Sequence, residues 1–297
     1  MNYQHAFHAG NFADVHKHVV LTRILEHLRA KPAAFRVIDT HAGAGRYDLS
    51  GPEAARSGEW QDGIGRLFDA AQQGHSQLGG ATSEPMSEAA IALLKPYLDI
   101  LGALNPVGSL RFYPGSPLIA KAQMRRQDRL IACESEPRAA AALQACLRGE
   151  ARAKVLALDG WMALNANVPP KERRGIVLID PPYEDSADFT RLPGALEDAY
   201  RKWATGIYML WYPIKERDAP DVLARRLRRS VLPKTLRCEI TLRPPSASIG
   251  LVGSGLIVVN PPYTLAQDLR ILLPALSRLF SPSAAFRLDR LSKEEKP

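Results

Sequence analysis

The chain has 297 residues, which is enough for one large domain or for one domain that carries an inserted subdomain. It is 46% hydrophobic and 24% charged, as is usual for soluble globular proteins, and no stretch approaches the roughly 18 apolar residues of a membrane span. The net charge of +8 favours a polyanionic partner, although a basic surface that only keeps a protein in solution gives the same value.

The cysteines indicate a reducing compartment. Cys133, Cys146 and Cys238 are odd in number and lack the spacing of metal ligands, so we expect free thiols. The first residues also lack the basic and then apolar layout of a signal peptide. These features predict a cytoplasmic protein that does not bind membranes.

The N-terminal segment predicts a loop followed by a helix. Residues 1–12 are polar and aromatic and contain a glycine, and we interpret them as a mobile arm. Asp14 can cap a helix that runs to about residue 29, with apolar side chains at helical spacing.

Four of the seven histidines lie within the first 18 residues, which raises the question of a metal site. His16 and His18 are two positions apart and therefore point to different faces of the predicted helix, so we expect no metal site. We expect Lys17 and His18 at the wall of a pocket instead, with Tyr3 and His5 on the arm.

The first clear strand covers residues 35–40 and ends in a glycine turn. His41, Gly43 and Gly45 follow it directly. A strand that ends in a Gly-x-Gly turn lets a ligand approach the backbone closely, but the pattern fits a simple tight turn as well. Its meaning depends on the strands that follow.

Residues 50–106 interrupt the α/β pattern. The stretch is too long for an ordinary loop and contains a helical pattern at residues 87–104, so we predict an inserted helical subdomain. The main domain would then comprise residues 1–49 and 107–297. We expect the polar middle of the insertion, residues 72–85, to be disordered.

Ser116 and Pro117 stand at the start of the next apolar helix. Serine is a favoured cap, and proline is favoured at the first helical position. The exposed N–H groups and the hydroxyl can also face the carboxylate of a ligand, although capping alone explains the serine.

Acidic residues end three successive predicted strands. Glu134 ends the strand at residues 130–134, and Asp159, followed by Gly160, ends the next. In nucleoside-binding α/β folds, a carboxylate at such a position accepts hydrogen bonds from a ribose or a base. Each acid alone fits an ordinary polar strand end, but three in succession favour a common ligand.

The third acid, Asp180, opens the motif Asp-Pro-Pro-Tyr after the wholly apolar residues 175–179. The prolines keep the following backbone extended and leave its carbonyls free. Asp180 and the Pro181 carbonyl can accept hydrogen bonds from an exocyclic amine, and Tyr183 can stack on its ring. The four residues alone equally fit a strand followed by a proline turn.

Three further strands are predicted at residues 206–212, 236–242 and 255–260. The turn after the last of them, Asn260 to Tyr263, has a composition similar to that of Asp180 to Tyr183, and we call the two turns the second corner and the Asp180 corner. We choose the Asp180 corner as the amine site. Its strand is the fourth, which lies beside the first strand in this architecture, whereas the last strand belongs further out. The chain closes with a helix at residues 265–280 and a charged tail, residues 288–297, that we expect to be loose.

The order of these parts resembles the Rossmann-like methyltransferases that use S-adenosylmethionine, and the Asp-Pro-Pro-Tyr variant is typical of those that methylate adenine N6. Several longer segments are similar to one family, the bacterial 23S ribosomal RNA adenine-N6 methyltransferases called RlmJ. They are FHAGNFADVHKH, DTHAGAGRYDLSG, YPGSP, IDPPYE, ATGIYMLWYP and SGLIVVNPPY, and they extend from the N-terminus to residue 263.

This resemblance implies a seven-stranded mixed sheet with a reversed final strand and a small helical insertion. It implies that S-adenosylmethionine is bound by His18, His41, Gly43, Ser116, Glu134, Asp159, Gly160 and Asp180. The catalytic residues would be Asp180, Pro181 and Tyr183, and the substrate-binding residues Tyr3, His5, Lys17 and Tyr183. We expect a monomer that acts on 23S ribosomal RNA, either naked or in an early assembly intermediate.

Three other functions stay open at this point. The motifs do not distinguish an RNA enzyme from a DNA adenine-N6 methyltransferase. A protein glutamine-N5 methyltransferase usually has asparagine in place of Asp180, which argues against that activity. A non-catalytic RNA-binding protein on a methyltransferase fold would not need acids at three strand ends.

Overall fold

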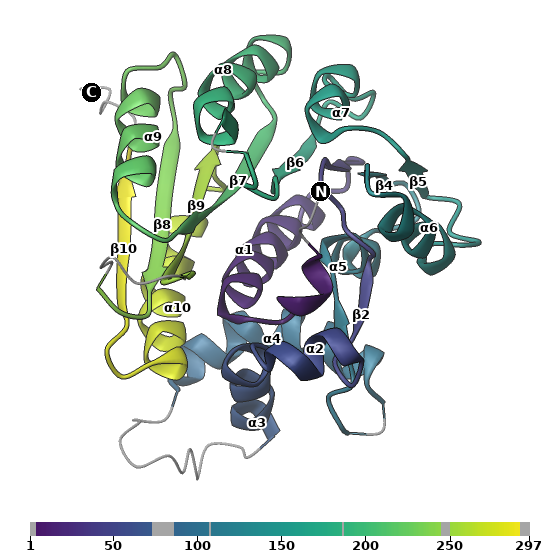
Figure 1. The fold of residues 1–297 in the computed structure, drawn as a ribbon. Helices are drawn as coiled ribbons and strands as arrows, with labels where there is room; N and C mark the ends of the chain where they lie inside the picture. The colour runs from purple at the N-terminus through teal and green to yellow at the C-terminus, as the bar shows by residue number, and fades with distance from the viewer. Residues whose placement is uncertain (1–3, 73–85, 107, 186, 245–249, 292–297) are drawn as a thin grey trace.

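The computed structural model describes residues 4–72, 86–106, 108–185, 187–244 and 250–291 (Figure 1). The strands are β1 (Arg36–Asp39), β2 (Arg46–Asp48), β3 (Phe112–Pro114), β4 (Arg129–Cys133), β5 (Ala153–Leu156), β6 (Gly175–Ile179), β7 (Ile207–Ile214), β8 (Thr235–Thr241), β9 (Gly253–Val259) and β10 (Ala285–Arg290). The helices are α1 (Phe12–Arg29), α2 (Pro52–Ser57), α3 (Arg66–Gln72), α4 (Glu88–Leu104), α5 (Ser116–Gln123), α6 (Pro137–Cys146), α7 (Gly160–Ala166), α8 (Ala187–Lys202), α9 (Asp218–Arg228) and α10 (Leu265–Phe280). Two short turns of helix, η1 (His5–Phe7) and η2 (Gln61–Gly65), complete them.

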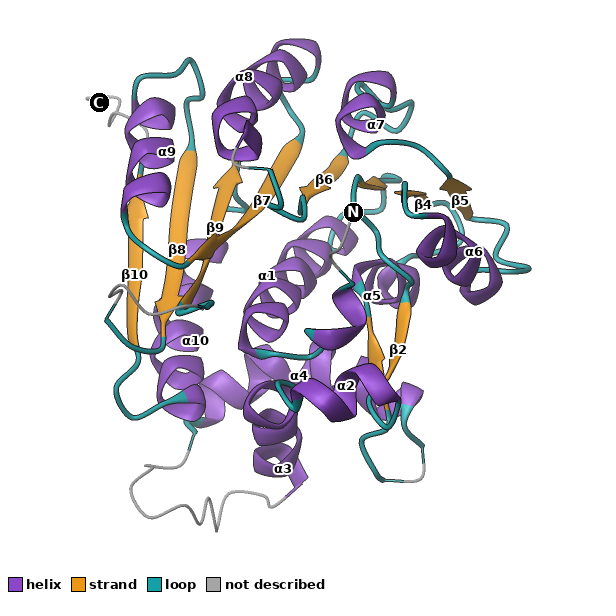
Figure 2. Cartoon of the chain, in the orientation of Figure 1, coloured by secondary structure: helices purple, strands orange, loops and turns teal. Residues whose placement is uncertain are grey.

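The described part of the chain forms one large mixed sheet in the order β10-β8-β9-β7-β6-β1-β4-β5 (Figure 2). The five strands from β7 to β5 in this order are parallel, and β9 lies antiparallel between β7 and β8. This confirms the predicted α/β fold with a mixed sheet and a reversed strand.

The sheet has eight strands rather than the predicted seven, because β10 pairs antiparallel with the edge strand β8. The prediction of a loose tail from residue 288 is therefore wrong for residues 288–290, whereas residues 292–297 lie outside the described residues. Two hydrogen bonds of 2.8 Å from the buried Arg237 guanidinium to Asp289 hold this strand in place.

Helices cover both faces of the sheet because its central strands are apolar on both sides. On β6, Ile176 and Leu178 join one hydrophobic cluster with α1, α5 and α10, while Val177 and Ile179 join a second cluster with α8 and α9. Figure 1 shows α8 and α9 side by side, away from α1 and α10. The alternation along β6 is the period of two that a strand imposes.

Two details of the N-terminal segment differ from the sequence prediction. Helix α1 begins at Phe12, and its cap is Asn11, whose side chain accepts hydrogen bonds from Ala13 and Asp14. Asp14 cannot serve as the cap because its carboxylate is buried among other partners. Residues 5–7 form the turn η1 rather than a loop, and Tyr3 lies outside the described residues.

The segment that we interpret as an insertion contributes α2, α3 and α4, which lie together at one end of the molecule (Figure 1). Leu67, Leu94 and Leu101 belong to the same hydrophobic cluster as α1 and α10. The helix predicted at residues 87–104 is confirmed as α4, and Ser87 is its cap. Most of the stretch predicted to be disordered lies outside the described residues, and the division into domains stays a prediction.

No helix among the described residues is long and apolar enough to cross a membrane.

Candidate active site

The strand-end acids lie on neighbouring strands. The last residue of β1, Asp39, pairs with Ala132 of β4 on one side and with Leu178 of β6 on the other. Glu134 and Asp180 follow those two strands by one residue each. Because parallel strands end at the same edge of a sheet, these carboxylates converge on one corner of the molecule.

The glycine turn after β1 is tied to the neighbouring acid. Gly43 has a φ of 61° and donates its N–H to Glu134 Oε2 at 2.8 Å. A Cβ atom at Gly43 would lie 2.2 Å from the Tyr47 hydroxyl, so only glycine fits there. The turn and Glu134 therefore form one rigid unit next to the strand ends.

Asp39 is a candidate functional residue that the sequence analysis missed. It is 1% exposed, and neither oxygen of its carboxyl group has a hydrogen-bond partner among the described residues. Burial, together with the nearby Asp180 charge, raises the pKa of Asp39 to about 7, and interactions with the Ser116 side chain, the Lys17 charge and the His41 backbone offset this rise only in part. A buried carboxyl group without a partner is costly, which points to a cationic ligand that compensates it.

Further along the same edge, Gly160 and His41 are in close contact. A Cβ atom at Gly160 would lie 2.3 Å from His41 Nε2. Burial lowers the pKa of His41 to about 4, so its ring is neutral at pH 7. The exposed Asp159 caps α7, since its Oδ1 accepts hydrogen bonds from Trp161 and Met162. The capping role and a ligand role are compatible, because these bonds use only one of its oxygens.

The other predicted cofactor residues, His18 and Ser116, are both buried. His18 Nδ1 lies 2.7 Å from the Tyr113 hydroxyl, and burial lowers the pKa of His18 to about 3. Ser116 is the first residue of α5 rather than its cap, which is Gly115. The predicted capping role is therefore wrong, and no cap bond occupies the Ser116 hydroxyl.

A buried ion-pair chain links α1 to the predicted catalytic acid. Lys17 Nζ lies 2.6 Å from Asp180 Oδ2 and 2.8 Å from Asp14 Oδ1, and His5 Nε2 lies 3.0 Å from Asp14 Oδ2. Burial lowers the pKa of Lys17, but the two carboxylates outweigh it and hold that pKa well above its usual value. The charge of Lys17 is thus already neutralised by two acids, and its predicted place at the wall of a pocket stays a prediction.

The Asp180 corner is supported by Trp211, a second residue that the sequence analysis did not single out. The Tyr183 hydroxyl donates to the Trp211 carbonyl at 2.5 Å, and the two rings meet edge to face at 5.7 Å. Lys17 Nζ lies 5.7 Å from the centre of the Trp211 ring. Tyr183 has a φ of 53°, a strained value for a tyrosine that these contacts maintain.

The second corner, Asn260 to Tyr263, is separated from this site. Strand β9 runs antiparallel to β7, so Asn260 lies at the opposite edge of the sheet from Asp180. Its side-chain amide donates to the carbonyls of Ala204 and Gly206, which precede β7, at 2.8 Å each. This corner therefore cannot share a ligand with the glycine turn after β1.

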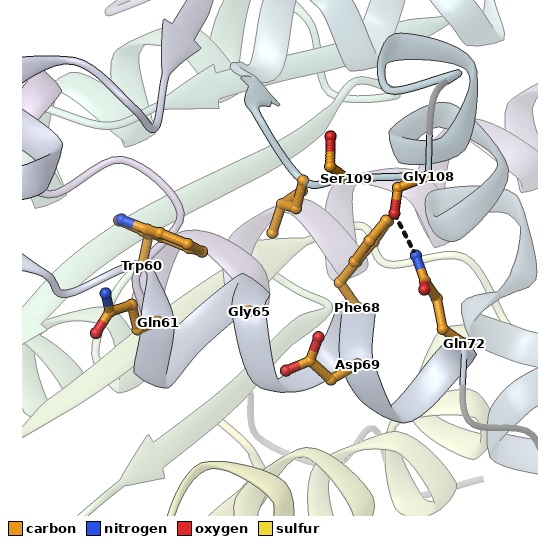
Figure 3. A pocket seen from close by; sticks show the side chains of 9 residues that line it. Trp60, Gln61, Gly65, Phe68, Asp69, Gln72, Gly108 and Ser109 are labelled. Carbon is orange, nitrogen blue, oxygen red and sulfur yellow. Dashed lines mark hydrogen bonds between the residues drawn. The ribbon is translucent and has the colours of Figure 1, made fainter.

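A hollow of about 340 Å³ lies on the helical segment (Figure 3). Trp60 and Phe68 contribute to its wall, and Gln72 donates to the Gly108 carbonyl at 2.9 Å across it. None of the predicted site residues lines this hollow.

Comparison with known proteins supports the resemblance. Residues 32–289 match the family model described as ribosomal RNA large subunit methyltransferase D, RlmJ. This chain belongs to the RlmJ family. It is 38% identical over 283 residues to ribosomal RNA large subunit methyltransferase J of Escherichia coli and 39% identical to that of Haemophilus influenzae, with 95% of each chain covered.

A crystal structure of a Legionella pneumophila protein has a similar fold, with a TM-score of 0.83 and 33% sequence identity. The match covers 95% of this chain and 98% of that one. The family match and this structural match thus agree on the overall fold.

Proposed function

We propose that this RlmJ family member transfers a methyl group from S-adenosylmethionine to N6 of an adenine in 23S ribosomal RNA. One observation carries the proposal. The Asp180 to Tyr183 corner ends β6, directly beside the strand β1 that ends in the Gly43 turn. An amine-binding corner and a turn that admits a ligand to the backbone therefore share one edge of the sheet.

The residues at this edge suit a cofactor with two positive charges, a ribose and an adenine. The buried Asp39 carboxylate would face the ammonium group, and Glu134 would accept from the ribose hydroxyls. Asp159 and Gly160 would hold the adenine, with His18, His41 and Ser116 closing the remaining sides. When bound, S-adenosylmethionine supplies a methyl group that is activated by the sulfonium.

Asp180 and Pro181 would position the acceptor amine. Lys17 fixes Asp180 through Oδ2, which leaves Oδ1 to accept one N6 hydrogen, while the Pro181 carbonyl accepts the other. Both bonds draw the N6 lone pair out of conjugation with the ring, where it is a poor nucleophile. This positioning accounts for much of the rate, since it makes a bimolecular step effectively unimolecular.

Asp180 would also take the proton that N6 releases. A carboxylate can take this proton because the methylated amine carries a positive charge and is strongly acidic. A base inside a stack has to leave it to reach the corner, and Tyr183 offers a ring for stacking. The arm residues Tyr3 and His5 would contribute to substrate binding.

The decisive experiment compares two substrates. The chain is incubated with S-adenosylmethionine labelled in the methyl group, and with either deproteinised 23S ribosomal RNA from cells that lack its gene or duplex DNA of mixed sequence. We expect N6-methyladenosine in the digested RNA and no labelled adenine in the DNA. Label confined to the DNA would establish the rival DNA methyltransferase, and label in neither would overturn the proposal.

A further inference from the structure

The corner that the methyl-transfer site leaves unused carries an exposed aromatic ring. Tyr263 is 87% exposed, and its ring meets His27 edge to face at 5.6 Å. The backbone beside it is fixed, since Asn260 donates through its N–H to Lys234 and through its amide to Ala204 and Gly206. A single exposed tyrosine needs no explanation, so the meaning of this one depends on its surroundings.

The loops that lead into the strands lie side by side along this edge. Strand register places Arg36 opposite both Arg129 and Gly175, and Val259 opposite both Tyr208 and Thr235. The beginnings of β4, β1, β6, β7 and β8 and the end of β9 are therefore aligned. Exposed cations occupy most of these loops: Lys31, Arg126, Lys171, Arg173, Lys202 and Lys234. We call these six cations and Tyr263 the basic edge.

The acids nearby do not neutralise the basic edge. Asp128 pairs with Arg125 at 2.9 Å, and Glu172 pairs with Arg36 at 2.7 Å. Among the described residues, no carboxylate pairs with any of the six cations of the basic edge. The four acids of the methyl-transfer site lie at the other edge of the sheet, away from these six cations.

Two further contacts place the cations close to the aromatic ring. Burial lowers the pKa of His27, and the charges of Lys31 and Arg174 lower it further. Arg174 also donates to the carbonyls of Ala33 and Leu28, which hold the loop of Lys31 beside the end of α1. Tyr263 is therefore linked through His27 to the cationic loops before β1 and β6.

The size of the basic edge suits a nucleic acid. Five steps between the six strands from β8 to β4, at about 4.8 Å each, give a row about 24 Å long. A duplex presents about 14 phosphate charges over that length. The basic edge lies about 17 Å from Asp180, the length of the five-residue strand β6, so one RNA molecule can reach both.

We propose that the basic edge binds the phosphate backbone of the substrate RNA outside the methylated loop, and that Tyr263 stacks on an unpaired base there. Cations with an exposed aromatic among them are the combination that binds RNA irrespective of sequence. The inference rests on the proposed function, because it assigns a second contact to the same substrate.

The test uses the triple variant K31A/R173A/K234A and the matched control R56A/R270A/R278A. All six side chains are exposed, both variants lose three charges, and neither touches the methyl-transfer site. Binding is measured by fluorescence anisotropy with two 23S RNA fragments, a short one holding only the target loop and a long one with its flanking stems.

We expect K31A/R173A/K234A to bind the long fragment about tenfold more weakly than the wild type. The slope of its log binding constant against log salt concentration should be smaller by about two. Binding of the short fragment, binding of S-adenosylmethionine and kcat at saturating RNA should stay unchanged, as should all values of the control. Equal losses of affinity for the long fragment in both triple variants, or no loss in either, would overturn the proposal that the basic edge binds RNA. Failure of the wild-type chain to methylate any RNA would instead overturn the proposed function.

Tyr263 is tested separately. Tyr263→Leu should weaken binding of the long fragment about fivefold, whereas Tyr263→Phe, which keeps the ring, should bind as the wild type does. Because the side chain is exposed, both variants should unfold at the wild-type temperature. Equal binding by the leucine and phenylalanine variants would remove stacking from the proposal.

Discussion

Lys17 Nζ lies 2.6 Å from Asp180 Oδ2, in a pair whose side chains are only 5% and 14% exposed. The two residues are 163 positions apart in the chain, and Asp14 holds the same ammonium from the other side at 2.8 Å. Helix α1 thus fixes the orientation of the acid that ends β6. The following predictions start from this contact.

Replacing Asp180 by Ala should lower methyl transfer by at least 10³-fold, because the amine loses both a hydrogen-bond acceptor and a base. The fold should survive, since Lys17 keeps its ion pair with Asp14. Methyl incorporation is measured beside circular dichroism and S-adenosylmethionine binding. Asp180→Asn, which keeps an acceptor oxygen, should retain more activity than the alanine variant. Normal turnover in Asp180→Ala would exclude Asp180 from the mechanism.

Replacing Lys17 by Met should lower the free energy of unfolding by about 3 kcal/mol, because it leaves two buried carboxylates without their cation. The matched control is Lys95→Met, whose partner Asp99 lies 2.7 Å away in a pair that is 68% and 62% exposed. There we expect a change below about 0.5 kcal/mol. Urea unfolding of both variants measures the difference. Similar losses of unfolding free energy in the two variants would show that the Lys17 contacts stabilise the fold no more than an exposed ion pair does.

The sequence predicts the parts of the site that local patterns define. Asp180 to Tyr183 and the Gly43 turn are visible because an apolar strand, prolines and glycines are adjacent in the chain. Asp39 stands in the same kind of position, one residue after an apolar strand interior, but the importance of Asp39 depends on burial without a partner, which only the packing around it reveals.

The errors have a similar cause. Asp14 is a good helix cap by residue type, yet Lys17 and His5 hold its carboxylate, and Asn11 takes over the capping. Strand β10 has only a short alternation, Phe286 and Leu288, and its side chains are mostly exposed. Its place in the sheet depends on pairing with β8 and on Arg237, about 50 residues earlier in the chain. Contacts between distant residues decide both cases, and no local pattern contains them.

Asp39 should make the stability of the ligand-free chain depend on pH. Its pKa is about 7 in the folded state and about 3.9 in an unfolded chain, so between these values the folded state binds more protons. Stability from this group is therefore present below about pH 4 and is lost as the pH rises to about 7. Asp39→Asn should remove this loss, so at pH 8 its free energy of unfolding should be about 2 kcal/mol higher than that of the wild type. Parallel stability curves of the two proteins between pH 4 and pH 8 would contradict this.

Gly160→Ala should weaken S-adenosylmethionine binding by at least tenfold. The added Cβ would lie 2.3 Å from His41 Nε2 and 2.5 Å from the Thr40 carbonyl, and a backbone oxygen cannot move aside cheaply. His41 and the strand end would shift, at a cost of about 1–3 kcal/mol in the free energy of unfolding.

The matched control is Gly102→Ala in α4, where the added Cβ would meet no atom of the described residues within 4 Å apart from the adjacent backbone of its own helix. Alanine is the better helix former, so the free energy of unfolding of this variant should rise by about 0.5–1 kcal/mol. The variant should bind the cofactor as the wild type does. Calorimetry gives the affinities and urea unfolding gives the stabilities. If Gly160→Ala bound S-adenosylmethionine normally, the contact between Gly160 and His41 would have no part in the cofactor site, and the adenine would have to lie elsewhere along the edge.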